Sequence, residues 1–404
     1  MSKAILIIGA GVEQIEAYKT AKGMGLTVVG SDMDQDAPAF KYADYRIIAS
    51  TRNIDETVGE VLKFVQHHHL DGVMTIANDV PLTVAAVAAK LDLSSIPIES
   101  ARIVSNKILM KTVFDENSIA NPPYASVDNI NNIICFVEKH GLPIVLKPVD
   151  GRGARGVLIL MDTDNLEWAY NHSMQNSDSN RVMVEKFIDG VQYSTEAIVY
   201  QGKCTTLSVS ERNYELLSKY SPYAIENGGV IPAQISKQHE ESIHHMMSSI
   251  ASSLNITNGT IKGDIIMSDD GPLVIEVALR LSGGYLCSVQ IPIARGVDLV
   301  KQTILMALGE DLIVSELVPK DLCWIGIRYF FPEPGKISKI SGFGELDNFE
   351  WVLKKQLFMS VGDIVELPTN HTKRVGYVYA VGDTFEQAEN RAISAAKQVK
   401  IETV

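Results

Sequence analysis

Two acidic residues lie close together in the segment from Lys262 to Tyr285, which reads KGDIIMSDDGPLVIEVALRLSGGY. Asp264 precedes one apolar run and Glu276 lies in the next, with an Asp-Asp-Gly turn between the runs. Antiparallel strands folded about that turn bring the two carboxylates together, where they repel unless a cation lies between them. Mg²⁺ binds one or two carboxylates together with phosphate oxygens. The pattern predicts a metal site beside a phosphate group; the alternative, an exposed hairpin of solvated acids, is disfavoured by the apolar residues around Glu276.

Arg280 follows this strand pair on the same side, where its guanidinium can meet a phosphate through two hydrogen bonds. The next residues, Ser282, Gly283 and Gly284, offer free backbone N–H groups to a second anion. We therefore expect two anionic groups to be bound at this end of the strand pair.

A glycine-rich loop, KPVDGRGARGV, joins two apolar strands around residue 150. Gly151, Gly153 and Gly156 let the backbone approach a polyphosphate closely, while Lys147 and Arg155 supply positive charge. The loop is not a P-loop, because the Gly-Lys-Ser/Thr sequence and the following helix are missing. Phosphate binding is the favoured interpretation, and an ordinary hairpin loop is the alternative.

The apolar strand from Val182 to Ile188 ends in alternating polar and apolar residues. A strand that leaves its sheet here offers backbone groups to an adenine edge and a carboxylate to ribose hydroxyls. By itself the segment is also typical of a plain edge strand.

The N-terminal sequence IIGAGVEQ, with Asp32 at the end of the next strand, is similar to a dinucleotide-binding turn. However, Gln14 occupies the place of the third glycine. A structural turn that packs a helix closely against a strand explains the pattern at least as well. The three consecutive histidines from His67 to His69 cannot all face one point on a helix, so we expect a solvated helix end there.

Composition excludes several classes of protein. The chain has 404 residues, of which 46% are hydrophobic and 21% charged, as in a folded protein of two or three domains. Its formal charge of −13 argues against nucleic-acid binding. No apolar stretch approaches the roughly 20 residues of a membrane span, and no signal peptide is recognisable, so a cytoplasmic protein is expected. The four cysteines are far apart among apolar neighbours and are expected to be buried free thiols: Cys135, Cys204, Cys287 and Cys323.

The helices and strands that must position these residues follow two different patterns along the chain. The first hundred residues alternate strands and helices, which predicts a doubly wound α/β sheet. The expected strands are Ala4–Ile8, Thr27–Gly30, Arg46–Ala49 and Gly72–Ile76, and the expected helices are Glu13–Met24, Ile54–His68 and Val80–Leu91. Beyond a polar helix at Asn106–Asn117 the strands come in antiparallel pairs, an α+β pattern. Domain boundaries are expected near residues 105 and 318.

Taken in this order and spacing, the pieces resemble the ATP-grasp superfamily along essentially the whole chain. The resemblance implies a Rossmann-like pre-ATP-grasp domain at 1–105, a two-lobed ATP-grasp domain at 106–318 with a lid at about 120–195, and a small α+β domain at 319–404. The last segment, with PEPG at 332–335 and RVGYVYAVGDT at 374–384, is similar to the C-terminal domain of L-amino-acid ligases and related carboxylate–amine ligases.

The resemblance also implies roles for single residues. The nucleotide-binding set would be Lys107, Lys147, Gly151, Gly153, Arg155, Gly156, Glu185, Lys186, Phe187, Ile188 and Glu196. Asp264 and Glu276 would hold Mg²⁺, with Mn²⁺ as a substitute, and Arg280 and Lys147 would stabilise the transferring phosphoryl group. Candidates for substrate binding are Glu211, Arg212, Glu226, Ser282, Gly283 and Gly284, although purely structural charges at 211–226 are equally consistent. Ala278 stands where the family has a metal-binding asparagine, so a second metal ion is left open.

The implied activity is an ATP-dependent carboxylate–amine ligase that forms an amide or peptide bond through an acyl phosphate and releases ADP and phosphate. The partners would be a small carboxylate and a small amine, and homodimers are common among similar proteins. Alternatives are delivery of the acyl group to a thiol, a carboxylase-type reaction, an NAD(P)-dependent oxidoreductase built on Gly9–Gly11 and Asp32, and a non-catalytic nucleotide sensor.

Overall fold

A four-stranded parallel sheet opens the fold in the computed structural model, which describes residues 2–404. The strand order is β3-β2-β1-β4, with β1 at Ala4–Ile8, β2 at Thr27–Asp32, β3 at Tyr45–Ile48 and β4 at Gly72–Met74. The helices that cover it are α1 Ile15–Gly23, α2 Ile54–Phe64 and α3 Pro81–Leu91. Every residue of β1 is buried, because apolar cores lie on both faces of the sheet. The predicted α/β sheet is confirmed.

Two helices lead from this sheet into the next part of the chain, α4 Ile98–Val104 and α5 Lys107–Glu116. The Asn106 side chain accepts hydrogen bonds from the backbone N–H groups of Ile108 and Leu109. Asn106 is therefore the N-cap of α5, which places Lys107 at the first helical position.

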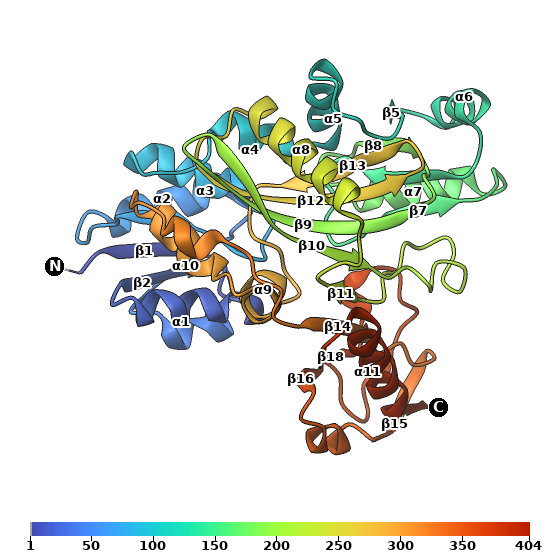
Figure 1. The fold of residues 1–404 in the computed structure, drawn as a ribbon. Helices are drawn as coiled ribbons and strands as arrows, with labels where there is room; N and C mark the ends of the chain where they lie inside the picture. Colours follow the sequence, from blue (N-terminus) through green and yellow to red (C-terminus); the bar gives the residue numbers. More distant parts are fainter. Residues whose placement is uncertain (1) are drawn as a thin grey trace.

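A small antiparallel sheet follows, with the order β5-β8-β6-β7. Its strands are β5 Tyr124–Val127, β6 Ile144–Pro148, β7 Leu158–Leu160 and β8 Val182–Lys186, and its helices are α6 Ile130–His140 and α7 Leu166–Gln175. The glycine-rich loop connects β6 to β7, as predicted. These elements form a separate lobe with its own apolar core (Figure 1).

The largest sheet has eight strands in the order β13-β12-β9-β10-β11-β14-β18-β16. The strands that come first in the chain are β9 Val191–Tyr200, β10 Lys203–Arg212, β11 Gly229–Ile231, β12 Gly259–Ser268 and β13 Gly271–Ala278. Helix α8, Lys237–Ser253, packs against β10, β12 and β13. The acidic strand pair consists of β13, which forms one edge of this sheet, and its neighbour β12.

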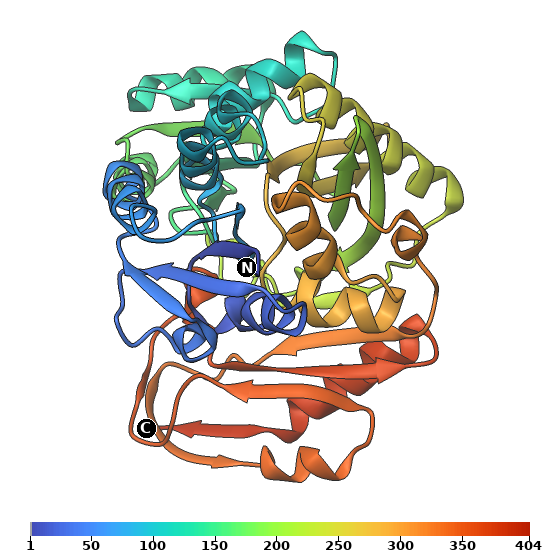
Figure 2. The same cartoon turned by 90° about the vertical axis from the view of Figure 1, so that its left-hand side faces the viewer.

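The C-terminal part extends this same sheet through β14 Trp324–Tyr329, β16 Val352–Leu357 and β18 Gly376–Gly382. Helix α11, Phe385–Gln398, packs on β14 and β18. A three-stranded sheet beside it contains β15 Gly335–Ser341, β17 Ile364–Val365 and β19 Lys400–Thr403. The hydrogen bonds from β11 to β14 thus hold the C-terminal segment against the central sheet. Figure 2 shows the strands of this segment, coloured orange to red, together at one end of the molecule.

Residues after β13 return to the N-terminal sheet. A parallel bridge joins Ile76 to Leu281, and α9 Ile291–Arg295 and α10 Leu299–Ala307 follow, with α10 packed on α1 and β4. One apolar core contains residues of β1, α1, α10, β9 and β14. The N-terminal sheet therefore packs firmly against the segment that follows β13, and it borders any site at the end of that strand.

Candidate active site

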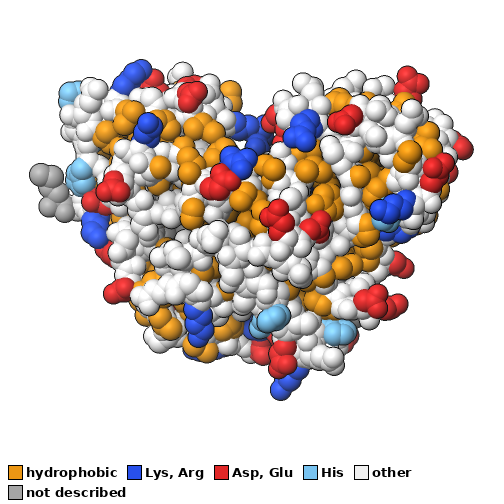
Figure 3. Space-filling view, turned by 90° about the horizontal axis from the view of Figure 1, so that it is seen from above, with side chains coloured by type: hydrophobic (Ala, Val, Ile, Leu, Met, Phe, Trp, Pro, Cys, Tyr) orange, Lys and Arg blue, Asp and Glu red, His pale blue; other side chains and the backbone are white. Residues whose placement is uncertain are grey.

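Two adjoining cavities lie at the end of the acidic strand pair. The larger, of about 340 Å³, lies between the small sheet and the large sheet. The smaller, of about 250 Å³, lies between the large sheet and the C-terminal segment. Four side chains border both cavities: Arg212, Lys262, Arg280 and His371. Seen from above, the surface is hollowed between two raised parts of the molecule, with basic side chains in the hollow (Figure 3).

Asp264 and Glu276 are direct partners across β12 and β13, and both border the larger cavity. A register shift follows this pair at Ile265, so the ladder is irregular beside the acids. Burial would raise the pKa of Asp264, but Lys262 and Arg212 outweigh it and hold that pKa low. At Glu276, whose side chain is only partly buried, burial would likewise raise the pKa, but Lys107 outweighs it and the pKa falls to about 2. Both side chains are therefore carboxylates at neutral pH.

This carboxylate pair suits a divalent cation that is shared with a bound phosphate better than a metal ion held by protein ligands alone. Within residues 2–404, no group of three or more His, Cys, Asp or Glu side chains is placed to hold a metal ion. Two carboxylates on neighbouring strands fit a cation that takes its other ligands from phosphate and water. Ala278, at the end of β13, borders the cavity without a ligating atom.

The floor of the larger cavity carries a buried charge cluster that the sequence did not reveal. The carboxylate of Glu185 lies between Lys111 Nζ, at 2.7 Å, and Lys147 Nζ, at 2.5 Å. Lys111 is fully buried, and burial lowers its pKa although Glu185 opposes that shift. Burial would raise the pKa of Glu185, but the two lysines lower it. Lys147 is held at the cavity by this cluster.

The glycine-rich loop closes one side of the larger cavity. Lys107 Nζ donates to Gly151 O at 2.8 Å and lies 3.3 Å from Glu276 Oε2. Gly151 and Gly153 border the cavity, as does Arg152. Arg155 and Gly156, which we expected there, do not border it; Gly156 instead packs at φ +69° where a Cβ would lie 2.6 Å from Asn176 Cβ.

The segment from Glu185 to Ile188 borders the larger cavity as expected, but Glu196 borders neither cavity. Glu196 is fully buried on β9 and accepts a hydrogen bond from Ser282 N at 2.8 Å. Burial raises its pKa to about 7 against the opposing effect of Ser282. Gln192 is the β9 residue that borders the cavity. Glu196 thus supports the loop after β13 instead of facing the cavity.

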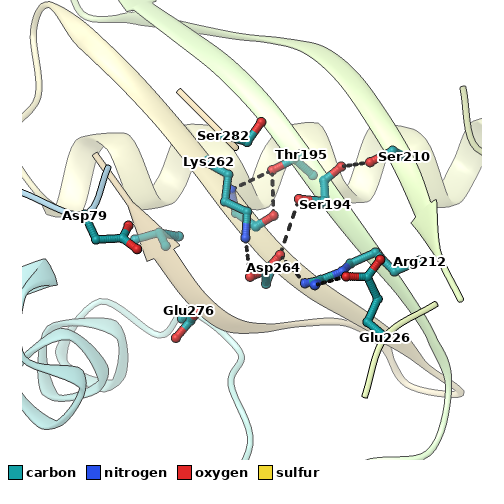
Figure 4. A network of polar contacts seen from close by, with 12 residues as sticks. Asp79, Ser194, Thr195, Ser210, Arg212, Glu226, Lys262, Asp264, Glu276 and Ser282 are labelled. Carbon is teal, nitrogen blue, oxygen red and sulfur yellow. Dashed lines mark hydrogen bonds and ion pairs between the residues drawn. The ribbon is translucent and has the colours of Figure 1, made fainter. Parts of the chain in front are cut away.

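A row of alternating acidic and basic side chains leads from Asp264 into the smaller cavity. Arg212 donates from Nη1 to Asp264 Oδ1 at 3.0 Å and from Nη2 to Glu226 Oε2 at 3.2 Å (Figure 4). Arg374 donates from Nη2 to the same Glu226 oxygen at 2.6 Å, and its guanidinium lies 3.7 Å from the centre of the Tyr329 ring. Arg374, from the C-terminal segment, was not recognised as a site residue from sequence.

Glu211 takes a different place from its neighbour Arg212. Successive residues of a strand point to opposite faces, and Arg212 occupies the face of Asp264. Burial raises the pKa of Glu211, and its charged neighbours are Glu389 and Arg328 of the C-terminal segment. Although Glu211 borders the smaller cavity, this placement favours a structural role for it.

The loop from Ser282 to Gly284 borders the smaller cavity and is tied to the N-terminal sheet. Gly284 N donates to Glu13 Oε2 at 2.9 Å, and a Cβ on Gly283 would lie 2.6 Å from that same oxygen. Arg280 Nε donates to Asp79 Oδ1 at 2.8 Å. Glu13 and Asp79 were both missed, although each lies in the segment that follows a parallel strand, β1 or β4, on the side where such sheets bind ligands.

Side chains of the protein itself fill the space beside the N-terminal glycine turn. Asp32 Oδ2 accepts from Ala10 N at 2.8 Å, so this carboxylate caps the turn. Gln14 lies over the glycines, where a Cβ on Gly11 would be 2.8 Å from its Oε1, and donates to Ile76 O. These contacts favour the structural turn over dinucleotide binding.

Two smaller expectations concern surface features. All four cysteines are free, but only Cys287 is buried; Cys135 is exposed on α6, so the expectation of four buried thiols was wrong. Apolar neighbours in sequence did not predict burial there, because a helix turns part of each run towards solvent. Among residues 2–404, no helix is long and apolar enough to span a membrane.

Comparison with known proteins agrees with this geometry. Residues 104–284 match the model of the ATP-grasp domain, and residues 328–404 match that of the L-amino acid ligase C-terminal domain 2. The fold and site thus define an ATP-grasp protein. The chain therefore contains an ATP-grasp domain, and its C-terminal segment is similar to that of L-amino acid ligases.

The relatives are distant. An L-arginine-specific L-amino acid ligase of Bacillus subtilis is 25% identical over 278 residues, which cover 66% of this chain and 64% of the relative. A phosphoribosylamine–glycine ligase of Pasteurella multocida is 24% identical over 98% of this chain and 94% of its own length. The solved L-amino acid ligase of Bacillus licheniformis superposes with a TM-score of 0.85 at 21% identity, covering 100% of this chain and 99% of the other. This superposition shows that the two chains share the fold.

Proposed function

We propose that the chain joins a carboxylic acid to an amine, forming an amide through an acyl phosphate with release of ADP and phosphate. The observation that carries the proposal is the shared wall of the two cavities. Arg212, Lys262 and Arg280 border both, so a phosphoryl group at the end of one cavity meets a carboxylate in the other among three cations. Charge that develops during phosphoryl transfer is stabilised by such fixed cations.

In this proposal the larger cavity binds ATP. The segment from Glu185 to Ile188 contacts the base, and Lys107, Lys147 and the glycine-rich loop contact the phosphates. Its lining by Lys107, Lys147 and Arg152 supplies the positive charge that a triphosphate needs. Closure of the loop would exclude water, which otherwise hydrolyses an acyl phosphate.

Asp264 and Glu276 would hold Mg²⁺, or Mn²⁺ in its place, together with oxygens of the triphosphate. Bound there, the cation neutralises charge on the transferring group. Lys262, Arg212 and Lys107 already pair with the two acids, so they hold the carboxylates in place before nucleotide binds.

The smaller cavity would bind the acid and the amine. Arg374 and the backbone of Ser282–Gly284 offer positions for carboxylates, and Glu226 fixes the directions of Arg212 and Arg374. The names of the related ligases make L-amino acids the first substrates to test. Because the reaction consumes ATP, we expect it to occur in the cytoplasm.

The test is a screen for ADP release. The twenty common L-amino acids are offered singly and in pairs with Mg-ATP, and separately with hydroxylamine, which traps an acyl phosphate as a hydroxamate. Amine-dependent ADP release with an amide product is expected. ADP release that instead requires a thiol or bicarbonate, or no turnover despite ATP binding, would contradict the proposal.

Two substitutions test the site within the active enzyme. Glu276→Gln and Lys147→Ala are each expected to remove most turnover, because they take away a metal ligand and a phosphate contact. A Lys203→Ala variant, changed at an exposed position on the far end of β10, serves as the matched control. Wild-type rates in either site variant would contradict the assignment.

A further inference from the structure

Among residues 2–404, one side chain that borders both cavities can accept a proton. Of the four residues that border both cavities, Arg212, Lys262 and Arg280 are cations without a free lone pair. The fourth is His371. Formation of an amide from an ammonium group releases two protons, so an acceptor at this wall has a chemical use.

The nearby carboxylates are already committed to cations. Glu226 lies between Arg212 and Arg374, and Asp264 lies between Arg212 and Lys262. By contrast, His371 Nε2 is buried and has no hydrogen-bond partner within residues 2–404. A buried, unpaired nitrogen at a ligand site is expected to find its partner in the ligand.

We propose that His371 is the catalytic base that takes a proton from the attacking amine. This inference rests on the proposed ligase function. One proton of the R–NH₃⁺ group passes to His371 Nε2, and the freed lone pair forms the C–N bond to the acyl carbon. The C–O bond to phosphate breaks with its electron pair, and the second amine proton leaves with the phosphate as HPO₄²⁻. The products are the amide, HPO₄²⁻ and the histidinium ion, so charge and protons balance.

The surroundings of His371 keep it uncharged until substrates arrive. The pKa of His371 is lowered to about 3, with burial as the main cause; Arg374 and Arg212 act in the same direction, while Glu226 and Asp264 act in the opposite direction. The imidazole therefore holds a free lone pair in the empty site. Anionic substrates placed against the same arginines offset their positive charge, which raises the basicity of His371 when the site is filled.

The backbone around His371 links it to the glycine-rich loop. His371 N donates to Gly153 O at 3.3 Å, and the Asn370 side chain accepts from Thr372 N at 2.9 Å to cap the short helix His371–Lys373. The imidazole is thus placed by the C-terminal segment and by the loop that closes over the phosphates. Proton removal would be available only when the loop is in place.

The test separates acyl-phosphate formation from amine attack. His371→Ala and His371→Asn are assayed with the amino-acid pair that gives the most ADP in the screen, and in parallel with hydroxylamine as the nucleophile. Hydroxylamine is largely unprotonated at neutral pH and does not need the base. Amide formation is expected to fall on the order of 100-fold, whereas hydroxamate formation stays within about threefold of wild type. Added imidazole is expected to restore part of the amide rate in His371→Ala.

Lys373→Ala is the matched control, because Lys373 lies in the same short helix but pairs with Glu366 at the surface. It is expected to leave both rates unchanged. Equal losses of amide and hydroxamate in the His371 variants would indicate a structural role and overturn the inference, as would unchanged amide rates. A wild-type enzyme that forms neither amide nor hydroxamate would instead contradict the proposed function.

Discussion

Arg280 Nε donates to Asp79 Oδ1 at 2.8 Å, and this contact joins the residue at the end of the acidic strand pair to the carboxyl end of the N-terminal sheet. Burial would raise the pKa of Asp79, but Arg280 holds it low, so the pair is ionised. The N-terminal sheet thus helps to position Arg280, which borders both cavities. Residues of the N-terminal, central and C-terminal segments thus line the proposed active site together.

Removal of the Asp79 charge tests this joint construction. Asp79→Asn is expected to lower kcat by roughly 10–100-fold, because a small misplacement of a group at the reacting atoms has an effect of that size. The KM for ATP is expected to stay within about twofold. Steady-state kinetics with varied ATP is the measurement, and an unchanged kcat would show that Arg280 is placed without Asp79.

The two lysines of α5 are expected to differ in their effects on stability. Lys111 is fully buried against Glu185, so Lys111→Met leaves a buried carboxylate with one partner fewer. We expect the free energy of unfolding to fall by about 3 kcal/mol, the size seen when one member of a buried pair is removed. Lys107→Met should cost about 1 kcal/mol or less, because its partner Glu276 is 39% exposed. Urea unfolding of both variants measures the difference, and equal losses would contradict this account.

Glu196 makes stability depend on pH in a direction that can be tested. Its pKa is about 7 in the folded protein against 4.5 as the ordinary value, and burial is the main cause. Since the folded pKa is the higher one, the favourable contribution of the neutral acid is fully present below about pH 4.5. It is lost as the pH rises through about 7.

Glu196→Gln, which stays neutral, is therefore expected to be more stable than wild type at pH 8 by about 2–3 kcal/mol. The gain should be much smaller at pH 5. Its amide oxygen can still accept the hydrogen bond from Ser282 N. Urea unfolding at the two pH values is the measurement, and a pH-independent difference would show that Glu196 is charged in the folded protein.

Substitutions at Arg374 and Lys147 test the two cavities separately, because Arg374 borders only the smaller cavity and Lys147 only the larger one. Arg374→Ala is expected to raise the KM for the amino-acid substrate about tenfold, the effect of losing a charge-assisted hydrogen bond, and to leave the KM for ATP unchanged. Lys147→Ala should weaken ATP binding instead, as measured by nucleotide titration. A rise in the KM for ATP in Arg374→Ala would contradict the division of the site.

The sequence predicted the parts of the site that neighbouring residues determine. The turn at Asp269–Gly271 folds β13 back on β12 and so brings Asp264 and Glu276 to the same end of the strand pair. The register shift at Ile265, which makes these two acids direct partners, has no signal in the sequence. The glycines fix the loop between β6 and β7. It did not reveal contacts between distant segments. Arg374 and Glu226 are 148 positions apart, and Arg280 and Asp79 are 201 apart. No local pattern carries such pairings.

The burial of charged side chains was also hard to predict, because the same residue type can face a ligand or solvent in one place and be buried in another. Glu196 matched a nucleotide-contact position by resemblance, yet strand β9 is covered on both sides and points its carboxylate at Ser282. Lys111 has the sequence of a solvated helix lysine, and only the placement of Glu185 on β8 explains its burial. The burial of such residues can be found only once the packing of whole helices and strands is known.

The central claim is that the acid is activated as an acyl phosphate. The most direct measurement uses an amino acid whose carboxylate carries oxygen-18, with mass spectrometry of the released phosphate. The account predicts one labelled oxygen in each phosphate, because the carboxylate oxygen that attacks ATP leaves with the phosphoryl group. Amide and ADP formation with unlabelled phosphate would contradict it.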